Sequence, residues 1–365
     1  MTRCIAPGWL VPWLVLMLMC VTAAAAGAAK DRPSDSLKID VFGDRMTVAM
    51  TGYPQVYLHG DIDVDAPQRF QSMMMSGRIP AGSDIYLNAR GGDLDAGMAL
   101  GRMFRKQGMA THLGTPRLPK NASVTAKIAQ CVDACVYAYL GGRYRWAPSG
   151  RDRIGFSSAP AGDAKAVARV NTYLGEMDVA ASALATAASP PHVGMAWMTA
   201  DEMVALGLAN NGKLPVTVTA RLTPPTPTVE LEQIERRGVH RLTIQCQPGQ
   251  TTVTALDHVG AVRARQVAAR RARSYFQLGD TRILDSTGDG VLAEGDALVI
   301  RRAYPPAELG NLVSAWTFGA WVDGRSNAFR DGFSMPIHTV YKQLSDYFQA
   351  CWRAAPWTPR PQQAG

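Results

Sequence analysis

A pair of glycines between an apolar strand and a helix is the feature that most restricts the fold of this chain. Residues 86–90 form the strand end, Gly91 and Gly92 follow, and apolar residues then recur at helical spacing as far as Phe104. A strand that turns through two glycines into a helix leaves backbone N–H groups exposed at the helix start. Such a corner can hold an anion or an oxyanion. We therefore expect an α/β fold with candidate oxyanion donors at Gly91 and Gly92.

Three further segments follow in order along the chain. Residues 131–142 read Cys-Val-Asp-Ala-Cys-Val-Tyr-Ala-Tyr-Leu-Gly-Gly and predict a helix that begins next to an Asp. Residues 153–157 predict a strand. Residues 197–208 predict a helix capped by Thr199, with acidic residues in its first turn.

In this order and at these spacings the four segments resemble the Clp-peptidase and crotonase superfamily, most closely its periplasmic Clp-like branch. The resemblance covers about residues 50–210 and implies a spiral of β-β-α units. In peptidases of that family a nucleophilic Ser begins the second of these segments and a base His ends the third. The matching positions here are Asp133 and Ser157, and the acidic third member falls near Met195 or Ala196. The resemblance therefore implies a preserved scaffold without the Ser-His dyad.

An Asp at this position cannot do the work of that dyad, because its carboxylate is a poor acyl acceptor and no His replaces the base. Our first interpretation is a non-catalytic binding or assembly protein of the cell envelope, with an unknown protein or peptide partner. The alternative is a serine hydrolase or peptidase with a relocated nucleophile at Ser157, Ser158 or Ser123. In a third interpretation Asp133 serves as a general acid or base, as carboxylates do in crotonase-type enzymes. The acyl-CoA substrates of those enzymes are cytosolic. This disfavours the third interpretation, because we expect this chain to be exported.

The first 29 residues have the pattern of a secretory signal peptide. Arg3 precedes an apolar stretch over residues 9–19, and small residues lead up to Lys30. Met19 is bulky where a lipoprotein site before Cys20 would need a small residue, so we do not expect lipidation. No later segment has the apolar length of a transmembrane helix. We expect a periplasmic or secreted mature chain.

Cysteine usage supports export. The mature chain keeps four cysteines, an even number that favours two disulfides in an oxidising compartment. Cys131 and Cys135 are four residues apart and lie on either side of Asp133, so a bridge between them would stiffen this turn. Two free buried thiols are the alternative. Cys246 and Cys351 are then paired by elimination.

A Pro-rich stretch suggests a domain boundary. We expect a Clp/crotonase-like domain over residues 38–221, an extended linker over residues 222–228 and a small α+β region over residues 229–365. In the last region, residues 239–246 and 251–256 predict a β-hairpin around Gln-Pro-Gly-Gln.

A second motif lies at residues 285–296, where oxygen-bearing side chains fall at calcium-loop positions 1, 3, 5 and 12 and Gly290 supplies the turn. The loop and residues 297–304 after it resemble the loop-helix unit of dockerin-type, EF-hand-like calcium repeats. This resemblance implies one Ca²⁺ bound by the side chains of Asp285, Thr287, Asp289 and Asp296 and the carbonyl of Val291. A metal-free turn is the alternative.

The chain carries a net charge of +8 and an Ala- and Arg-rich segment, residues 262–276, that predicts a helix. No aromatic residues interleave with the basic ones, so we expect a solvated helix face and no nucleic-acid binding. Because members of the Clp family form trimers or hexamers, the resemblance also implies a homo-oligomer.

Overall fold

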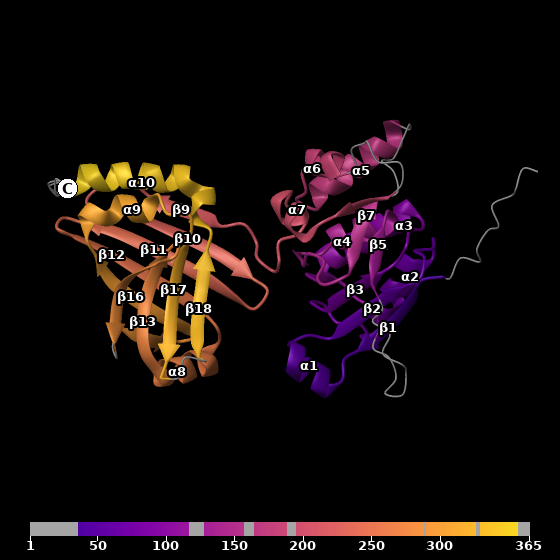
Figure 1. The fold of residues 1–365 in the computed structure, drawn as a ribbon, viewed down its shortest axis with the longest axis horizontal. Coiled ribbons are helices and arrows are strands. Elements are labelled where there is room, and N and C mark those ends of the chain that lie inside the picture. The colour runs from indigo at the N-terminus through magenta and orange to yellow at the C-terminus, as the bar shows by residue number, and fades with distance from the viewer. Residues whose placement is uncertain are drawn as a thin grey trace, which may run out of the picture. The chain divides into compact units, whose positions relative to one another are not determined.

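Two separate hydrophobic clusters organise the chain in this computed structural model. One includes residues from Leu37 to Ala209, and the other includes residues from Val229 to Ala355. We call the regions around them the N-terminal and C-terminal lobes (Figure 1). The structure describes residues 36–116, 128–156, 164–187, 195–287, 290–325 and 329–356. No helix in these ranges is both long enough and apolar enough to cross a membrane.

The N-terminal lobe contains a mostly parallel sheet. Its strands, in spatial order, are β1 (Lys38–Phe42), β2 (Gln55–His59), β3 (Asp84–Asn88), β4 (Ala110–Leu113) and β6 (Tyr144–Arg145). Strand β1 is an antiparallel edge, and the others run parallel. Parallel neighbours need crossover connections. Helices α2 (Ala66–Met75) and α3 (Leu94–Lys106) lie on the crossovers from β2 to β3 and from β3 to β4, whereas α1 (Arg45–Thr51) lies on the connection between the antiparallel strands β1 and β2.

A smaller sheet completes this lobe. It consists of β5 (Gln130–Val132), β7 (Arg153–Phe156) and β8 (Ala196–Met198), accompanied by α4 (Ala134–Leu140), α5 (Ala164–Glu176), α6 (Ala181–Ala187) and α7 (Ala200–Ala205). Thr199 and Glu202 form a capping box, which confirms the predicted cap of the last helix. The helix is shorter than predicted, because Trp197 and Met198 pair with β7 as a strand.

The C-terminal lobe has two antiparallel sheets. The larger one follows the order β15 (Val291–Glu294), β16 (Ala297–Tyr304), β12 (Gln250–His258), β11 (Gly238–Gln247), β10 (Thr228–Glu235) and β9 (Thr217–Arg221). The smaller one follows β14 (Thr281–Thr287), β13 (Arg271–Leu278), β17 (Phe318–Gly324) and β18 (Arg330–Met335). Helical elements are α8 (Ala261–Arg270), η1 (Pro306–Glu308), α9 (Leu309–Val313), η2 (Ile337–Val340) and α10 (Tyr341–Ala354). The predicted hairpin is confirmed as β11 and β12.

The Pro-rich segment has a different role from the predicted linker. Arg221 at the end of β9 pairs with Thr228 at the start of β10, so residues 222–227 form the connection of a hairpin within one sheet. The prediction of an interdomain linker at residues 222–228 was wrong in this respect. Prolines lack an amide donor and suit a turn as well as an extended spacer, which is why composition alone could not separate the two.

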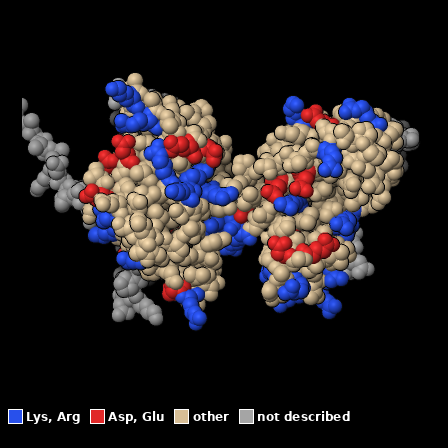
Figure 2. All heavy atoms as spheres, turned by 180° about the vertical axis from the view of Figure 1, so that it is seen from behind, with Lys and Arg blue, Asp and Glu red and all other residues tan. Residues whose placement is uncertain are grey.

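The Arg-rich segment is a helix over only part of its predicted length. In α8, Ala264, Val267 and Ala268 are buried at helical spacing, whereas β13 begins at Arg271 and pairs with β14 and β17. Aromatic residues Tyr275 and Phe276 favour the strand. On the face seen in Figure 2, basic groups are interspersed with acidic groups and form no continuous basic surface.

The helix predicted after the calcium motif is also wrong. Residues 297–304 form strand β16, which pairs with β15 and β12 and buries Leu298, Val299 and Ile300. The motif therefore lies in a strand-turn-strand segment instead of a loop-helix unit. Among the described residues no group of three acidic, His or Cys side chains is placed to hold a metal, but Asp289 and the side chains of Asp285 and Thr287 lie outside the described part of the chain. Calcium binding itself stays a prediction.

Candidate functional site

A strained turn joins β5 to α4 in the N-terminal lobe. Its central residue, Asp133, has φ 49° and ψ −110°, a conformation that residues other than glycine rarely adopt. Holding it costs about 1–3 kcal/mol, and such strain concentrates at functional sites. The same strand-to-helix turn presents the nucleophile in hydrolases that use a sharp elbow. The geometry thus places a carboxylate where an enzyme of that kind would carry a hydroxyl.

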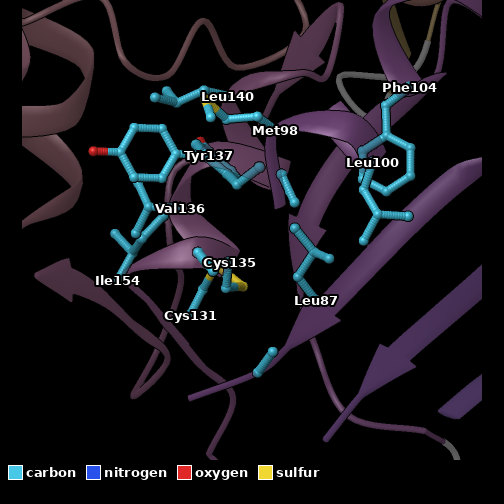
Figure 3. Packing of buried hydrophobic residues seen from close by; sticks show 14 of the residues in the cluster. Leu87, Met98, Leu100, Phe104, Cys131, Cys135, Val136, Tyr137, Leu140 and Ile154 are labelled. Atoms are coloured by element: carbon cyan, nitrogen blue, oxygen red, sulfur yellow. A yellow bond between two sulfur atoms is a disulfide. The ribbon is translucent and has the colours of Figure 1, made fainter. Parts of the chain in front are cut away.

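The expected disulfide spans this elbow. The Cα atoms of Cys131 and Cys135 are 5.2 Å apart, and their sulfur atoms are at bonding distance. Both residues are fully buried, and Figure 3 shows them within the cluster that includes Leu87, Val136 and Ile154. The bridge links Cys131 in strand β5 to Cys135 in the first turn of helix α4. It therefore limits the backbone movement by which Asp133 could relax.

The paired glycines lie beyond the end of β3. Gly92 has φ 124°, and a Cβ on it would come within 2.2 Å of the Ile62 carbonyl oxygen, so only glycine fits. The Gly91 carbonyl accepts from Ile62 N at 3.1 Å, and Asp93 N donates back to the Ile62 carbonyl at 2.7 Å. Neither the Gly91 nor the Gly92 amide donates to another group among the described residues. Two amides are thus available at this corner.

Pairing between the sheets relates the corner to the elbow. Ala89 forms a parallel bridge with Cys131, and Val132 N donates to the Ala89 carbonyl at 3.0 Å. The helices that start after the two turns also touch, because Gly97 in α3 lies against the Ala134 carbonyl of α4. The carboxyl ends of the two strands are therefore neighbours. Ligands of open α/β sheets bind at such strand ends.

Tyr137 lies one helical turn after Asp133, and the sequence analysis did not select it. Its burial, with the negative charge of Asp133, raises the pKa of Tyr137 to about 12. Its hydroxyl has no hydrogen-bond partner among the described residues, while its carbonyl accepts from the Tyr173 hydroxyl at 2.5 Å. The spacing of four residues from Asp133 on one helix was the available signal for this neighbour.

The other candidate residues divide into two groups. Ser157, Ser158 and Ser123 lie outside the described residues. Met195 and Ala196, at the position of the third family member, lie directly before and at the start of β8. Asp133 N donates to the Gly155 carbonyl at 3.3 Å, so the elbow is hydrogen-bonded to β7.

The two histidines of this lobe that the structure describes, His59 and His112, are engaged elsewhere. The Nε2 atom of His59 is 2.9 Å from an Asp40 carboxylate oxygen. His112 is stacked between Tyr86 and Trp146, with ring centroids 4.8 and 4.4 Å away. Neither imidazole is therefore positioned as a base for Asp133.

Comparison with known proteins gives distant structural neighbours. No family model and no curated protein matches the chain. Similar solved structures include a variant of ClpP1 from Listeria monocytogenes and a variant of the membrane-bound stomatin-specific protease 1510-N. The first is 15% identical with a TM-score of 0.31 and covers 45% of this chain and 93% of its own. The second is 15% identical with a TM-score of 0.29 and covers 42% of this chain and 75% of its own.

These low scores carry no conclusion about activity. The class that the structure itself defines is a mixed α/β protein with several sheets and two cysteine pairs at disulfide distance. Within that class its particular feature is an Asp at a disulfide-spanned elbow.

Proposed function

We propose that this chain is an exported Clp-like protein that binds another polypeptide and does not cleave it. The observation that carries the proposal is Asp133 at the elbow, with φ 49° and a single disulfide, Cys131–Cys135, that spans it. An anhydride formed on such a carboxylate would be labile, and His59 and His112 are both engaged with other side chains. The family scaffold is thereby kept for binding or assembly, with homo-oligomer formation as part of the same proposal.

The two glycine amides supply the binding chemistry. Amides that have no acceptor in the described parts of the chain can donate to the carbonyl oxygens of an extended peptide, as in other cases of main-chain recognition. Two disulfides, one of them at the site, are compatible with an oxidising compartment. The signal peptide predicted over residues 1–29 would deliver the chain there.

One observation favours the second candidate, a serine hydrolase with a relocated nucleophile. Val132 pairs with Gly155 in β7, and β7 ends at Phe156, the residue directly before Ser157 in the sequence. A fluorophosphonate serine probe applied to the mature protein decides between the two candidates. No adduct is expected, with an active Clp-type peptidase as the positive control. An adduct on Ser157, Ser158 or Ser123 that its own Ala variant abolishes would establish the hydrolase instead.

Rebuilding the dyad tests the position of the elbow directly. In the double variant Asp133→Ser with Ser157→His, we expect labelling of the new hydroxyl, because the strands that lead into the elbow and into the glycine corner are bridged at Ala89 and Cys131. Asp133→Ser alone and Ser157→His alone are the matched controls, and each is expected to label at least about tenfold more slowly. Equal labelling of all three variants would refute this alignment of the elbow.

We also propose Ca²⁺ binding at residues 285–296, now as a strand-turn-strand site. Val291 and Asp296 lie on and after β15, and the Oδ1 atom of Asp296 is 3.1 Å from Nδ1 of His258. Calorimetric titration of the chelator-treated protein should show one Ca²⁺ per chain and a raised melting temperature. Asp289→Ala should remove both effects. If both persist in that variant, the ion binds elsewhere.

A further inference from the structure

A cavity in the C-terminal lobe has the features of a small-molecule site. Its volume is about 370 Å³, and it lies between the hairpin of β13 and β14 on one side and η1, α9 and the loop before β17 on the other. Pockets for small ligands usually measure about 300–1,000 Å³. The lining combines aromatic and aliphatic groups with polar ones: Leu278, Ile283, Tyr304, Glu308, Asn311 and Trp316.

Trp316 is the most unusual member of this lining. Its residue surface is 69% exposed, although large aromatic side chains are normally buried. The His338 ring lies parallel to the indole at a centroid distance of 3.9 Å and an interplanar angle of 7°. One indole face is thus covered by protein, while the side chain as a whole stays open to solvent.

The backbone around Trp316 is held in place. Its carbonyl accepts from His338 N at 3.2 Å, and Nδ1 of His338 lies 3.0 Å from the same oxygen. The next carbonyl, that of Thr317, accepts from Gly279 N at 3.1 Å. The indole is therefore oriented before any ligand arrives, which lowers the entropic cost of binding.

The floor and rim add polar groups at fixed positions. The Tyr304 hydroxyl is part of a buried residue and donates to the Glu308 carbonyl at 3.2 Å. Burial and the nearby Glu308 carboxylate raise the pKa of Tyr304 to about 12, so the hydroxyl stays protonated at neutral pH. Asn311 is exposed on α9 and brings an amide that both donates and accepts hydrogen bonds.

This lining selects among chemical classes of ligand. An anionic ligand would be repelled by the Glu308 carboxylate in the lining. A cationic ligand would be repelled by the net charge of the chain, which is +8. An alkyl chain would displace the water that is hydrogen-bonded to the Asn311 amide and would offer no hydrogen bonds in exchange. A sugar ring presents an apolar C–H face to an aromatic side chain and hydroxyls around its edge. It therefore matches an indole wall with a polar rim.

We propose that this cavity binds a ring of a neutral saccharide, with Trp316 as the stacking surface and Asn311 at the hydroxyl-binding rim. The proposal is independent of the function assigned to the N-terminal lobe. In this proposal the C-terminal lobe has its own saccharide-binding site.

Calorimetric titration of the full mature chain with cellotetraose, maltotetraose and the tetramer of N-acetylglucosamine tests this proposal. At least one is expected to bind with a dissociation constant of about 1 mM or lower. Trp316→Ala should weaken that binding by at least about tenfold, and Asn311→Ala by several-fold. Trp352→Ala, at a 37% exposed tryptophan on α10, is the matched control and should leave the constant unchanged.

Three results would overturn the saccharide proposal. The first is no heat from any tetrasaccharide at about 10 mM, and the second is equal binding by the Trp316→Ala variant. The third is binding of decanoate to the cavity in place of all three sugars, which would make it a lipid site. Because Trp316 is largely exposed, its Ala variant should keep the melting temperature of the natural protein, and this is measured alongside.

Discussion

Removing the Cys246–Cys351 bridge by joint substitution to Ala is expected to lower the free energy of unfolding by about 4–5 kcal/mol. The bridge closes a loop of 105 residues and ties α10 to β11, with both cysteines essentially unexposed. Cross-linking so long a loop restricts the unfolded chain strongly, and the stabilisation grows with the logarithm of loop length. Urea unfolding followed by circular dichroism measures the difference.

The Cys131–Cys135 bridge is the internal comparison. Its sequence separation is only 4, so the same loop argument predicts a loss of about 2 kcal/mol for the double Ala variant. The larger loss should therefore come from the long loop. Equal losses from the two pairs, or no loss from Cys246 and Cys351, would contradict the prediction.

Substituting His240 by Gln is expected to destabilise the protein by about 3–5 kcal/mol at pH 6, because it leaves a buried carboxylate without its cation. His240 in β11 lies opposite Asp257 in β12, with Nδ1 2.9 Å from a carboxylate oxygen. Its Nε2 atom is 3.4 Å from a carboxylate oxygen of Glu235. The His240 and Asp257 side chains are 8% and 5% exposed, so solvent screens this pair weakly.

The pH dependence of this effect has a definite sign. Burial by itself would lower the pKa of His240, but Asp257 and Glu235 together raise it from 6.5 to about 9. A raised folded-state pKa gives stabilisation that is complete below pH 6.5 and lost as the pH rises through 9. The difference between the natural protein and the His240→Gln variant should therefore shrink by about 3 kcal/mol between pH 6 and pH 10.

His258 provides the matched control for this experiment. It also lies on β12 and pairs with an Asp, but Asp296 is 64% exposed and the Nδ1–Oδ1 distance is 3.1 Å. A solvated pair of this kind contributes about 0–1 kcal/mol. His258→Gln should therefore change stability little at either pH. A His240→Gln effect that is the same at pH 6 and pH 10 would refute the charged state of His240.

Local sequence patterns predicted the parts of the site that depend on short-range geometry. Gly91 and Gly92 were selected because a strand-to-helix turn requires them, and Gly92 indeed lies against the Ile62 backbone. Asp133 was recognised as the residue at the helix start, and its positive φ agrees with an elbow. Both cysteine pairs followed from an even count and a spacing of four. Except for the Cys246–Cys351 pair, which followed by elimination, each of these inferences used residues that are close together along the chain.

The errors came from segments whose conformation depends on a distant partner. Residues 297–304 carry the apolar residues of a plausible helix, yet they form β16 because β12 offers a full antiparallel ladder. The segment after Arg270 leaves the helix for the same reason, since β17 and β14 pair with it on both sides. Propensity differences of less than about 1 kcal/mol per residue cannot outweigh such pairing.

The sequence by itself determined the glycine corner, the acidic elbow and the cysteines that enclose it, because these depend on backbone sterics over a few residues. Only the tertiary structure decided that residues 222–227 turn within a sheet, that residues 297–304 form a strand, and that Trp316 borders a cavity. Those features arise where strands pair and where elements pack against one another. Their energies depend on burial and pairing, which exist only once the chain has folded.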